Sequence, residues 1–136
     1  MAFEIHERER EDVTILDVSG RLIVGLSSGA LRERIGLAIT AGKRHVVLNL
    51  SGVDYIDSTG LGTMVLCYRN MQSAGGALKL LKLNRRELEL LVLTKLTTIF
   101  DIYNEEQEAL NSFYPDREIK KFDILSFIKQ TQEEGM

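Results

Sequence analysis

The sequence VDYIDSTGLG, residues 53–62, passes from a short apolar stretch directly into a helical pattern, and this junction organises the whole chain. Asp, Ser and Thr are favoured at the first positions of a helix because their side-chain oxygens accept the unpaired N–H groups of the first turn. A helix is therefore predicted to begin around Ser58. The first residue of this helix carries the hydroxyl of Ser58, with the carboxylate of Asp57 beside it.

The start of this helix has two interpretations. The free N–H groups and the positive end of the helix dipole suit an anion, including a phosphate on Ser58 itself. Gly60 and Gly62 keep the surface around the hydroxyl low, so that another protein could approach the backbone closely. Alternatively, Ser58 is an ordinary helix cap. Asp54, which faces the opposite way along the preceding strand, is expected to be a solvated residue.

Predicted strands lie on both sides of this junction. They cover residues 3–5, 13–18, 46–50, 77–83 and 99–103, with the second ending at Gly20 and residues 22–24 able to continue the sheet. The run at 46–50 has few polar breaks, as in a strand that is covered on both faces. The segment at 3–5 alternates with charged residues, as a half-exposed edge strand would.

Predicted helices alternate with these strands. Ser27 or Ser28 can cap the first helix, and Gly42 ends it. The helix that begins at Ser58 ends at Gly75. Two capping-box patterns, at residues 84–87 and 104–107, open a third and a fourth helix. Strands that alternate with helices favour an α/β fold with a mixed, largely parallel sheet of about five strands, covered by four helices.

Several segments resemble the STAS domain, the fold of bacterial anti-sigma factor antagonists. The resemblance rests on Asp-Ser-Thr-Gly-Leu-Gly at 57–62, Gly-Arg-Leu at 20–22, the strand at 45–51 and the glycine turn and strand at 75–80. These segments stand in the order of the family and cover roughly residues 3–112. The expected fold is therefore STAS-like, with a STAS domain at residues 1–113.

The resemblance also implies a function and a site. In that family, the anti-sigma factor is also a serine kinase that phosphorylates the antagonist, and a serine phosphatase reverses this. Ser58 matches the phosphoacceptor, with Thr59 as the alternative, and Asp57 either helps to cap the helix or orients the Ser58 hydroxyl and later repels the phosphate. The implied partner-binding residues are Asp57, Ser58, Thr59, Gly60, Leu61 and Gly62.

Two positions depart from the family pattern. Ile23 stands where an aspartate near the phosphoacceptor is usual, so one acidic neighbour of Ser58 is missing. Lys95 stands where a glycine is usual, so the third helix is expected to end without a left-handed cap.

Composition and motifs favour a regulatory binding module with no catalytic residues, no metal and no cofactor. A net charge of −3 gives no electrostatic case for binding nucleic acid. Only two histidines and one cysteine are present, and no nucleotide-binding or hydrolase motif occurs. The lone Cys67 suits a reducing compartment, and the chain shows no signal peptide and no membrane-spanning run, so a cytoplasmic protein is expected. The alternative function is a non-catalytic STAS scaffold or a subunit of a signalling or lipid-transport complex.

Residues 114–136 form a predicted C-terminal extension. If Asp123 caps a short helix, then Ile124, Leu125, Phe127 and Ile128 share one side of it. An apolar side of this kind is expected to dock on its own domain, on a second subunit as a homodimer, or on an external partner.

Overall fold

The computed structural model describes residues 2–118 and 122–134, and its centre is a five-stranded sheet with the strand order β1-β2-β3-β4-β5. The strands are β1 (Glu4–Arg10), β2 (Val13–Leu22), β3 (His45–Ile56), β4 (Ala77–Leu81) and β5 (Ile102–Tyr103). β1 is antiparallel to β2, and every other neighbouring pair is parallel. The predicted largely parallel sheet is therefore confirmed.

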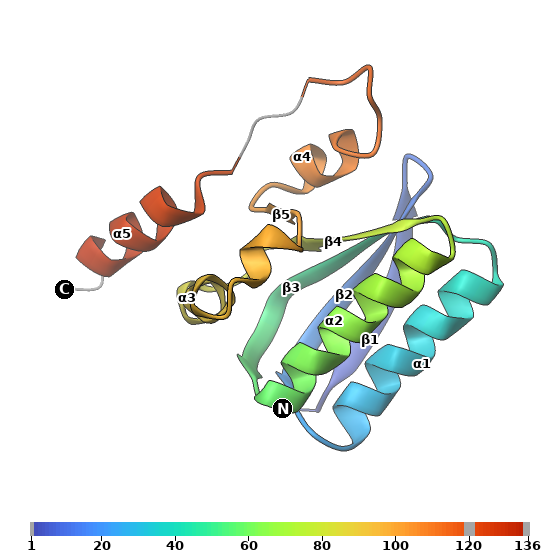
Figure 1. Cartoon of the computed structure of the whole chain (residues 1–136), viewed down its shortest axis with the longest axis horizontal. Coiled ribbons are helices and arrows are strands. Elements are labelled where there is room, and N and C mark those ends of the chain that lie inside the picture. Colours follow the sequence, from blue (N-terminus) through green and yellow to red (C-terminus); the bar gives the residue numbers. More distant parts are fainter. Residues whose placement is uncertain (1, 119–121, 135–136) are drawn as a thin grey trace.

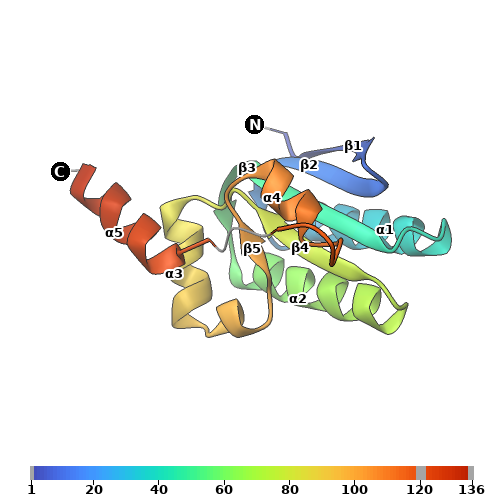
Figure 2. The ribbon, with the colours of Figure 1, turned by 90° about the horizontal axis from the view of Figure 1, so that it is seen from above.

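Helices cover both faces of this sheet. They are α1 (Leu26–Thr40), α2 (Ser58–Ser73), α3 (Arg85–Leu93), the 3-10 helix η1 (Leu96–Thr98), α4 (Glu106–Asn111) and α5 (Ile124–Glu134). Figures 1 and 2 show α1 and α2 on one face of the sheet and α4 on the other, with α5 outermost against α3. The prediction of four covering helices and an additional C-terminal helix is confirmed.

The central strand β3 shows why the sheet needs cover on both faces. Successive side chains of a strand point to opposite sides. Val46 and Leu48 belong to the main core that α1 and α2 cover, whereas Val47 lies in a second apolar cluster with Ala109 and Leu110 of α4. Consecutive residues of β3 from Val46 to Leu48 are therefore apolar and buried, as predicted for a doubly covered strand.

The end of β2 and the start of α1 differ from the prediction. β2 does not end at Gly20 but continues to Leu22, the first of the residues predicted to be able to continue the sheet, with register irregularities on either side of Gly20, which has a φ of +98°. Glycine tolerates this backbone, so it produces a bulge in place of an end. Ser27 and Ser28 are not caps. Both lie buried inside α1, and both hydroxyls donate to the carbonyl oxygen of Ile23, at 3.0 and 2.7 Å.

The two predicted capping boxes have opposite outcomes. At α3, the Asn84 side chain accepts from the Glu87 N–H at 2.8 Å, and the Glu87 carboxylate accepts from the Asn84 N–H at 3.4 Å, which confirms the box. At α4, the N-cap residue is Glu105 and makes no side-chain cap bond, so that prediction was wrong. The carboxylate of Glu106 binds Arg8 and Arg10 of β1.

The last part of the chain also needs two corrections. Lys95 has a φ of +62°, so α3 does end with a left-handed residue although no glycine stands there. In the C-terminal helix, Ile124, Phe127 and Ile128 pack against the main core, but Leu125 is 68% exposed. The predicted four-residue apolar side is therefore a three-residue side that contacts the protein's own domain.

Candidate functional site

The start of α2 is organised by Asp57, the N-cap residue. Its backbone is extended, and its Oδ1 accepts the N–H of Gly60 at 2.7 Å. Its Oδ2 reaches outside the helix and accepts the N–H of Val24 at 2.9 Å, in the loop between β2 and α1. Ser58 is the first helical residue and is exposed. Asp57 performs the capping, so the hydroxyl of Ser58 is not the helix cap.

These hydrogen bonds determine the charge at the site. N–H groups from Gly60 and Val24 hold the pKa of the Asp57 carboxyl below its usual value, and the nearby charge of Arg21 acts in the same direction. Asp57 is therefore ionised at neutral pH. Because each of its oxygens already accepts a backbone N–H, it is a weak base toward the neighbouring hydroxyl. Arg21 lies over the ring of Tyr55, with its guanidinium carbon 5.1 Å from the ring centroid.

The two glycines of the predicted site have different surroundings. Gly60 is buried, and a Cβ at this position would lie 2.2 Å from the carbonyl oxygen of Leu22, so only glycine lets α2 pack this closely on β2. Gly62 is exposed, and a Cβ there would meet nothing within 4 Å. Leu61 is half-buried and packs against the main core. The structure therefore places Ser58, Thr59 and Gly62 on the outside, and Gly60 beneath them.

One exposed side of α2 continues from this point. Ser58, Gly62 and Leu66 follow each other at intervals of four residues and therefore lie on the same side of the helix. Leu66 is 40% exposed. The hydroxyl thus stands at the end of a low surface that becomes apolar two turns later.

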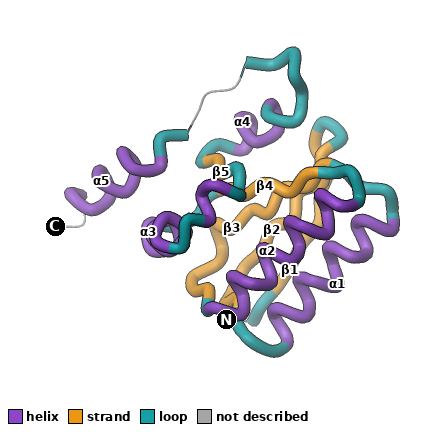
Figure 3. Tube along the Cα trace, in the orientation of Figure 1, coloured by secondary structure: helices purple, strands orange, loops and turns teal. Residues whose placement is uncertain are grey.

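Sequence reasoning missed the loop beside Ser58. Val24 was expected to continue the sheet, yet it is 66% exposed, and Leu26 at the start of α1 is 94% exposed. Figure 3 shows this loop and the start of α2 at the same end of the molecule. The signal in the sequence was the apolar Leu26 between Gly25 and Ser27, ahead of the buried residues of α1. We call Ser58, Thr59 and Gly62, which lie beside this loop, the Ser58 surface.

Ile23 lies next to this surface. The N–H of Asp57 donates to the carbonyl oxygen of the preceding Leu22 at 3.1 Å, which brings residue 23 beside the start of α2. The Ile23 side chain is half-buried and supplies no carboxylate. Asp57 is consequently the acidic residue that the structure holds directly against the start of α2. Asp54 is exposed, as expected.

The other polar and reactive residues lie in environments that indicate a role in the fold. Cys67 is buried, and burial raises the pKa of its thiol to about 11, which leaves it unreactive at neutral pH. His45 stacks on Phe113 with ring centroids 4.8 Å apart. Among the described residues, no three His, Cys, Asp or Glu side chains are grouped as metal ligands. No helix in the described part of the chain is long and apolar enough to cross a bilayer.

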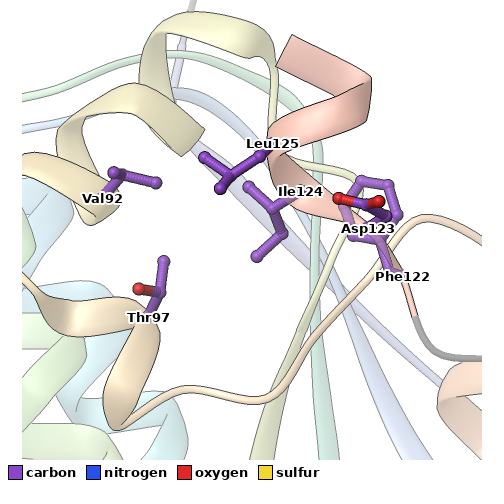
Figure 4. A pocket seen from close by; sticks show the side chains of 6 residues that line it. All are labelled: Val92, Thr97, Phe122, Asp123, Ile124 and Leu125. Atoms are coloured by element: carbon purple, nitrogen blue, oxygen red, sulfur yellow. The ribbon is translucent and has the colours of Figure 1, made fainter. Parts of the chain in front are cut away.

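Two hollows lie away from Ser58. One, of about 550 Å³, lies between α3, η1 and the start of α5 and is mostly apolar (Figure 4). Its lining residues are Val92, Thr97, Phe122, Asp123, Ile124 and Leu125. The carboxylate of Asp123 is engaged as the cap of α5, because it accepts the Ser126 N–H at 3.1 Å. The other hollow, of about 470 Å³, is a groove between the ends of β3 and β4 that includes Asp54, Lys82 and Asn84. None of the predicted site residues lines either hollow.

Comparison with known proteins gives consistent matches over most of the chain. The STAS domain model matches residues 4–109. The chain is 30% identical over 102 residues to the anti-sigma-B factor antagonist of Bacillus subtilis, covering 75% of this chain and 92% of the relative. It is 32% identical over 110 residues to the anti-sigma-B factor antagonist of Listeria monocytogenes, covering 79% and 93%.

Solved structures agree with the fold. The crystal structure of an anti-sigma factor antagonist from Mycobacterium paratuberculosis superposes with a TM-score of 0.70 at 21% identity. The match covers 82% of this chain and 93% of that one. The α/β arrangement described above is therefore also found in known structures.

Proposed function

The chain belongs to the STAS domain family, and from this membership we propose that it is an anti-sigma factor antagonist controlled by phosphorylation of Ser58. The observation that carries the proposal is the exposed hydroxyl of Ser58 at the first residue of α2. Asp57 already caps the helix, so the fold does not need this hydroxyl. A residue that is exposed, polar and unused by the fold is available to a kinase and to a partner.

In the proposed unphosphorylated state, the Ser58 surface binds an anti-sigma factor that is also a serine kinase. Binding sequesters the anti-sigma factor and so frees a sigma factor to direct transcription. The relatives named above are antagonists of an anti-sigma factor, which supports this choice of partner. The protein itself catalyses no reaction in this scheme, which takes place in the cytoplasm.

The phosphoryl transfer then works as follows. The Ser58 Oγ attacks the γ-phosphorus of ATP, a new O–P bond forms, and the bond between that phosphorus and the β,γ-bridging oxygen breaks to release ADP. In this scheme the hydroxyl proton passes to a base on the kinase, because the N–H groups bound to Asp57 lower the basicity of its carboxylate and Ile23 offers no carboxylate. The antagonist thus presents the nucleophile, and the partner supplies the base.

The phosphate changes binding through charge. It adds about −1.5 to −2 charges next to the ionised Asp57. The positive end of the α2 dipole suits an anion, so the fold tolerates the phosphate. A closely packed partner surface does not, because the charge must be desolvated there. A loss of about 4 kcal/mol would weaken binding about a thousandfold, and a serine phosphatase would restore it.

The test begins with the purified protein, the anti-sigma factor kinases of its source organism and ATP. Mass spectrometry is expected to place one phosphate on Ser58. Ser58→Ala should bind the kinase and never be released, whereas Ser58→Asp should bind at least about tenfold more weakly. Thr59→Ala is the matched control and should still be phosphorylated and released. A phosphate on Thr59, or on neither residue, contradicts the assignment.

A scaffold or a subunit of a signalling or lipid-transport complex is the second candidate. The observation in its favour is α5, which lies beyond the residues that match the STAS model and adds a surface of its own. A homodimer through this extension belongs to the same proposal. Binding to a partner that is independent of Ser58 modification, together with a change in mass after truncation at Pro115, would favour this second function.

A further inference from the structure

The loop between β2 and α1 carries two apolar side chains that the fold does not use. Val24 is 66% exposed and Leu26 is 94% exposed, although α1 buries Leu31 and Ile35 fully or nearly so. Leu26 therefore contributes almost nothing to the stability of the folded chain. Exposed apolar side chains that lie together on one segment are the kind of surface that a partner can bury.

This loop is not a free segment, because side chains hold its backbone on both sides. Ser27 Oγ accepts the Ile23 N–H at 2.9 Å, and both serine hydroxyls of α1 donate to the Ile23 carbonyl oxygen. One residue later, the Val24 N–H donates to Asp57 Oδ2 at 2.9 Å. Gly25 then turns the chain into α1 with a φ of +102°. The backbone of the loop that carries Val24 and leads to Leu26 is thus held by specific hydrogen bonds.

The bond from Val24 connects the loop to the phosphoacceptor. Asp57 uses one oxygen to cap its own helix and the other to hold a segment that lies 33 residues earlier in the chain. A cap alone needs only the first of these bonds. The second bond holds Val24 beside Asp57, the residue that directly precedes Ser58.

On the basis of the function proposed above, we infer that Asp57 is a positioning residue. It holds Val24 and Leu26 as a second, apolar part of the surface that the anti-sigma factor binds. The occupant is the same partner that approaches Ser58. A protein interface covers about 800 Å² on each side, so a partner in contact with Ser58 also covers the loop bonded to Asp57. The partner surface should offer apolar pockets for the two side chains and a shallow contact over Gly62.

The binding test compares two exposed leucines on α1. Leu26→Ser removes the residue in the proposed interface, and Leu37→Ser removes one that is 58% exposed further along the same helix. Each purified anti-sigma factor of the source organism is titrated calorimetrically with the wild type and with both variants. Leu26→Ser should bind at least about tenfold more weakly, and Leu37→Ser should stay within about twofold of the wild type.

The outcomes separate the two proposals. If no anti-sigma factor binds the wild type, the proposed function fails and this inference fails with it. If the wild type binds and Leu26→Ser binds equally well, only this inference is overturned. Self-association of the wild type that Leu26→Ser abolishes would assign the loop to a second copy of the chain and would also overturn it.

The positioning role of Asp57 has its own readout. Asp57→Asn is nearly isosteric but keeps a single acceptor oxygen, so it cannot accept both the Gly60 and the Val24 N–H groups. Amide exchange of Val24, followed by NMR, should accelerate at least about tenfold in this variant, while the buried amide of Leu48 keeps its protection. Unchanged exchange at Val24 would refute the positioning role without any partner present.

A double-mutant cycle completes the test. If Asp57 acts by holding the loop, then Leu26→Ser should weaken binding much less in the Asp57→Asn background than in the wild type. Strictly additive losses in affinity would show that the two residues act independently, and the inference would be wrong.

Discussion

The starts of α2 and α4 both carry acidic residues, and these residues bind different groups. At α2, the carboxylate of Asp57 accepts two backbone N–H groups and leaves Ser58 exposed. At α4, the N-cap residue Glu105 makes no side-chain cap bond, and the carboxylate of Glu106 binds the guanidinium groups of Arg8 and Arg10 on β1. The difference lies in the neighbours. An acid that binds the cations of β1 joins the sheet to a helix, whereas an acid that binds backbone N–H groups holds a loop beside its helix.

Arg8 lies in a cluster of polar side chains that are joined by hydrogen bonds and ion pairs. Arg8 Nε donates to Asp17 Oδ2 at 2.6 Å, and Asn49 Nδ2 donates to Asp17 Oδ1 at 2.7 Å. These groups connect β1, β2 and β3 to α4 across one face of the sheet. Hydrogen bonds from Arg8 hold the pKa of Glu106 at about 2, well below its ordinary value of 4.5. This region serves the fold and offers few unused groups to a partner.

The largest expected effect on stability comes from substituting one of the two glycines of α2, with the other glycine as the comparison. Gly60→Ala places a Cβ 2.2 Å from the Leu22 carbonyl oxygen and should destabilise the protein by about 3 kcal/mol or more. Gly62→Ala meets nothing within 4 Å and should stabilise α2 by up to about 1 kcal/mol. Urea unfolding measures both. Equal effects at the two positions would show that Gly60 has no special packing role.

Replacing Glu106 should remove the ion pairs that join α4 to β1. Glu106→Gln removes the charge that Arg8 and Arg10 share, and we expect a loss of about 2 kcal/mol at pH 7. The folded pKa of about 2 lies below the ordinary 4.5, so the stabilisation is present above pH 4.5 and is lost as the pH falls toward 2. The stability difference between variant and wild type should therefore shrink over this window. A difference that is constant from pH 7 to pH 3 would contradict the ionic origin.

Glu87 at the start of α3 sharpens the comparison, because it is an acid with neither cations nor solvent around it. Burial raises the pKa of Glu87 to about 7. A carboxyl whose pKa is raised on folding stabilises the protein below pH 4.5, and this contribution is lost as the pH rises to 7. Glu87→Gln removes the charge and keeps one acceptor oxygen for the Asn84 N–H, while its amide NH2 replaces the oxygen that accepts from Asn84 Nδ2. It should be more stable than the wild type by about 1 to 2 kcal/mol at pH 8 and equally stable near pH 4. Thermal unfolding at the two pH values checks this; destabilisation at pH 8 would refute it.

The smallest effect concerns the end of α3. Lys95 adopts a φ of +62° that glycine accepts more readily. Lys95→Gly should therefore stabilise the protein by about 0.5 kcal/mol, after the greater freedom of glycine in the unfolded chain is subtracted. Lys82→Gly, at a φ of +58°, is a matched substitution at a second left-handed position and should behave alike. A loss of stability in both variants would mean that the lysine side chains contribute more than the backbone strain costs.

Local patterns in the sequence were sufficient wherever a group finds its partner within a few residues. The capping box of Asn84 and Glu87 lies within the start of one helix, and the turn at Gly75 follows directly after the end of another. Periodicity and residue type therefore predict both features. The helix start at Asp57 and Ser58 was predictable for the same reason. The alternation of strands and helices gave the parallel sheet, because each crossover follows from local lengths and apolar periods.

Tertiary structure decided everything that depends on neighbours distant in the chain. Glu106 binds Arg8 across a separation of 98 residues, and Asp57 holds Val24 across 33, so neither the missing cap of α4 nor the exposed Leu26 could be read from a local pattern. The contrast between Gly60 and Gly62 has the same origin, since only the packing of α2 on β2 places a carbonyl oxygen over one of them. A sequence specifies which groups need a partner; the fold determines which of the available groups comes close enough to be that partner.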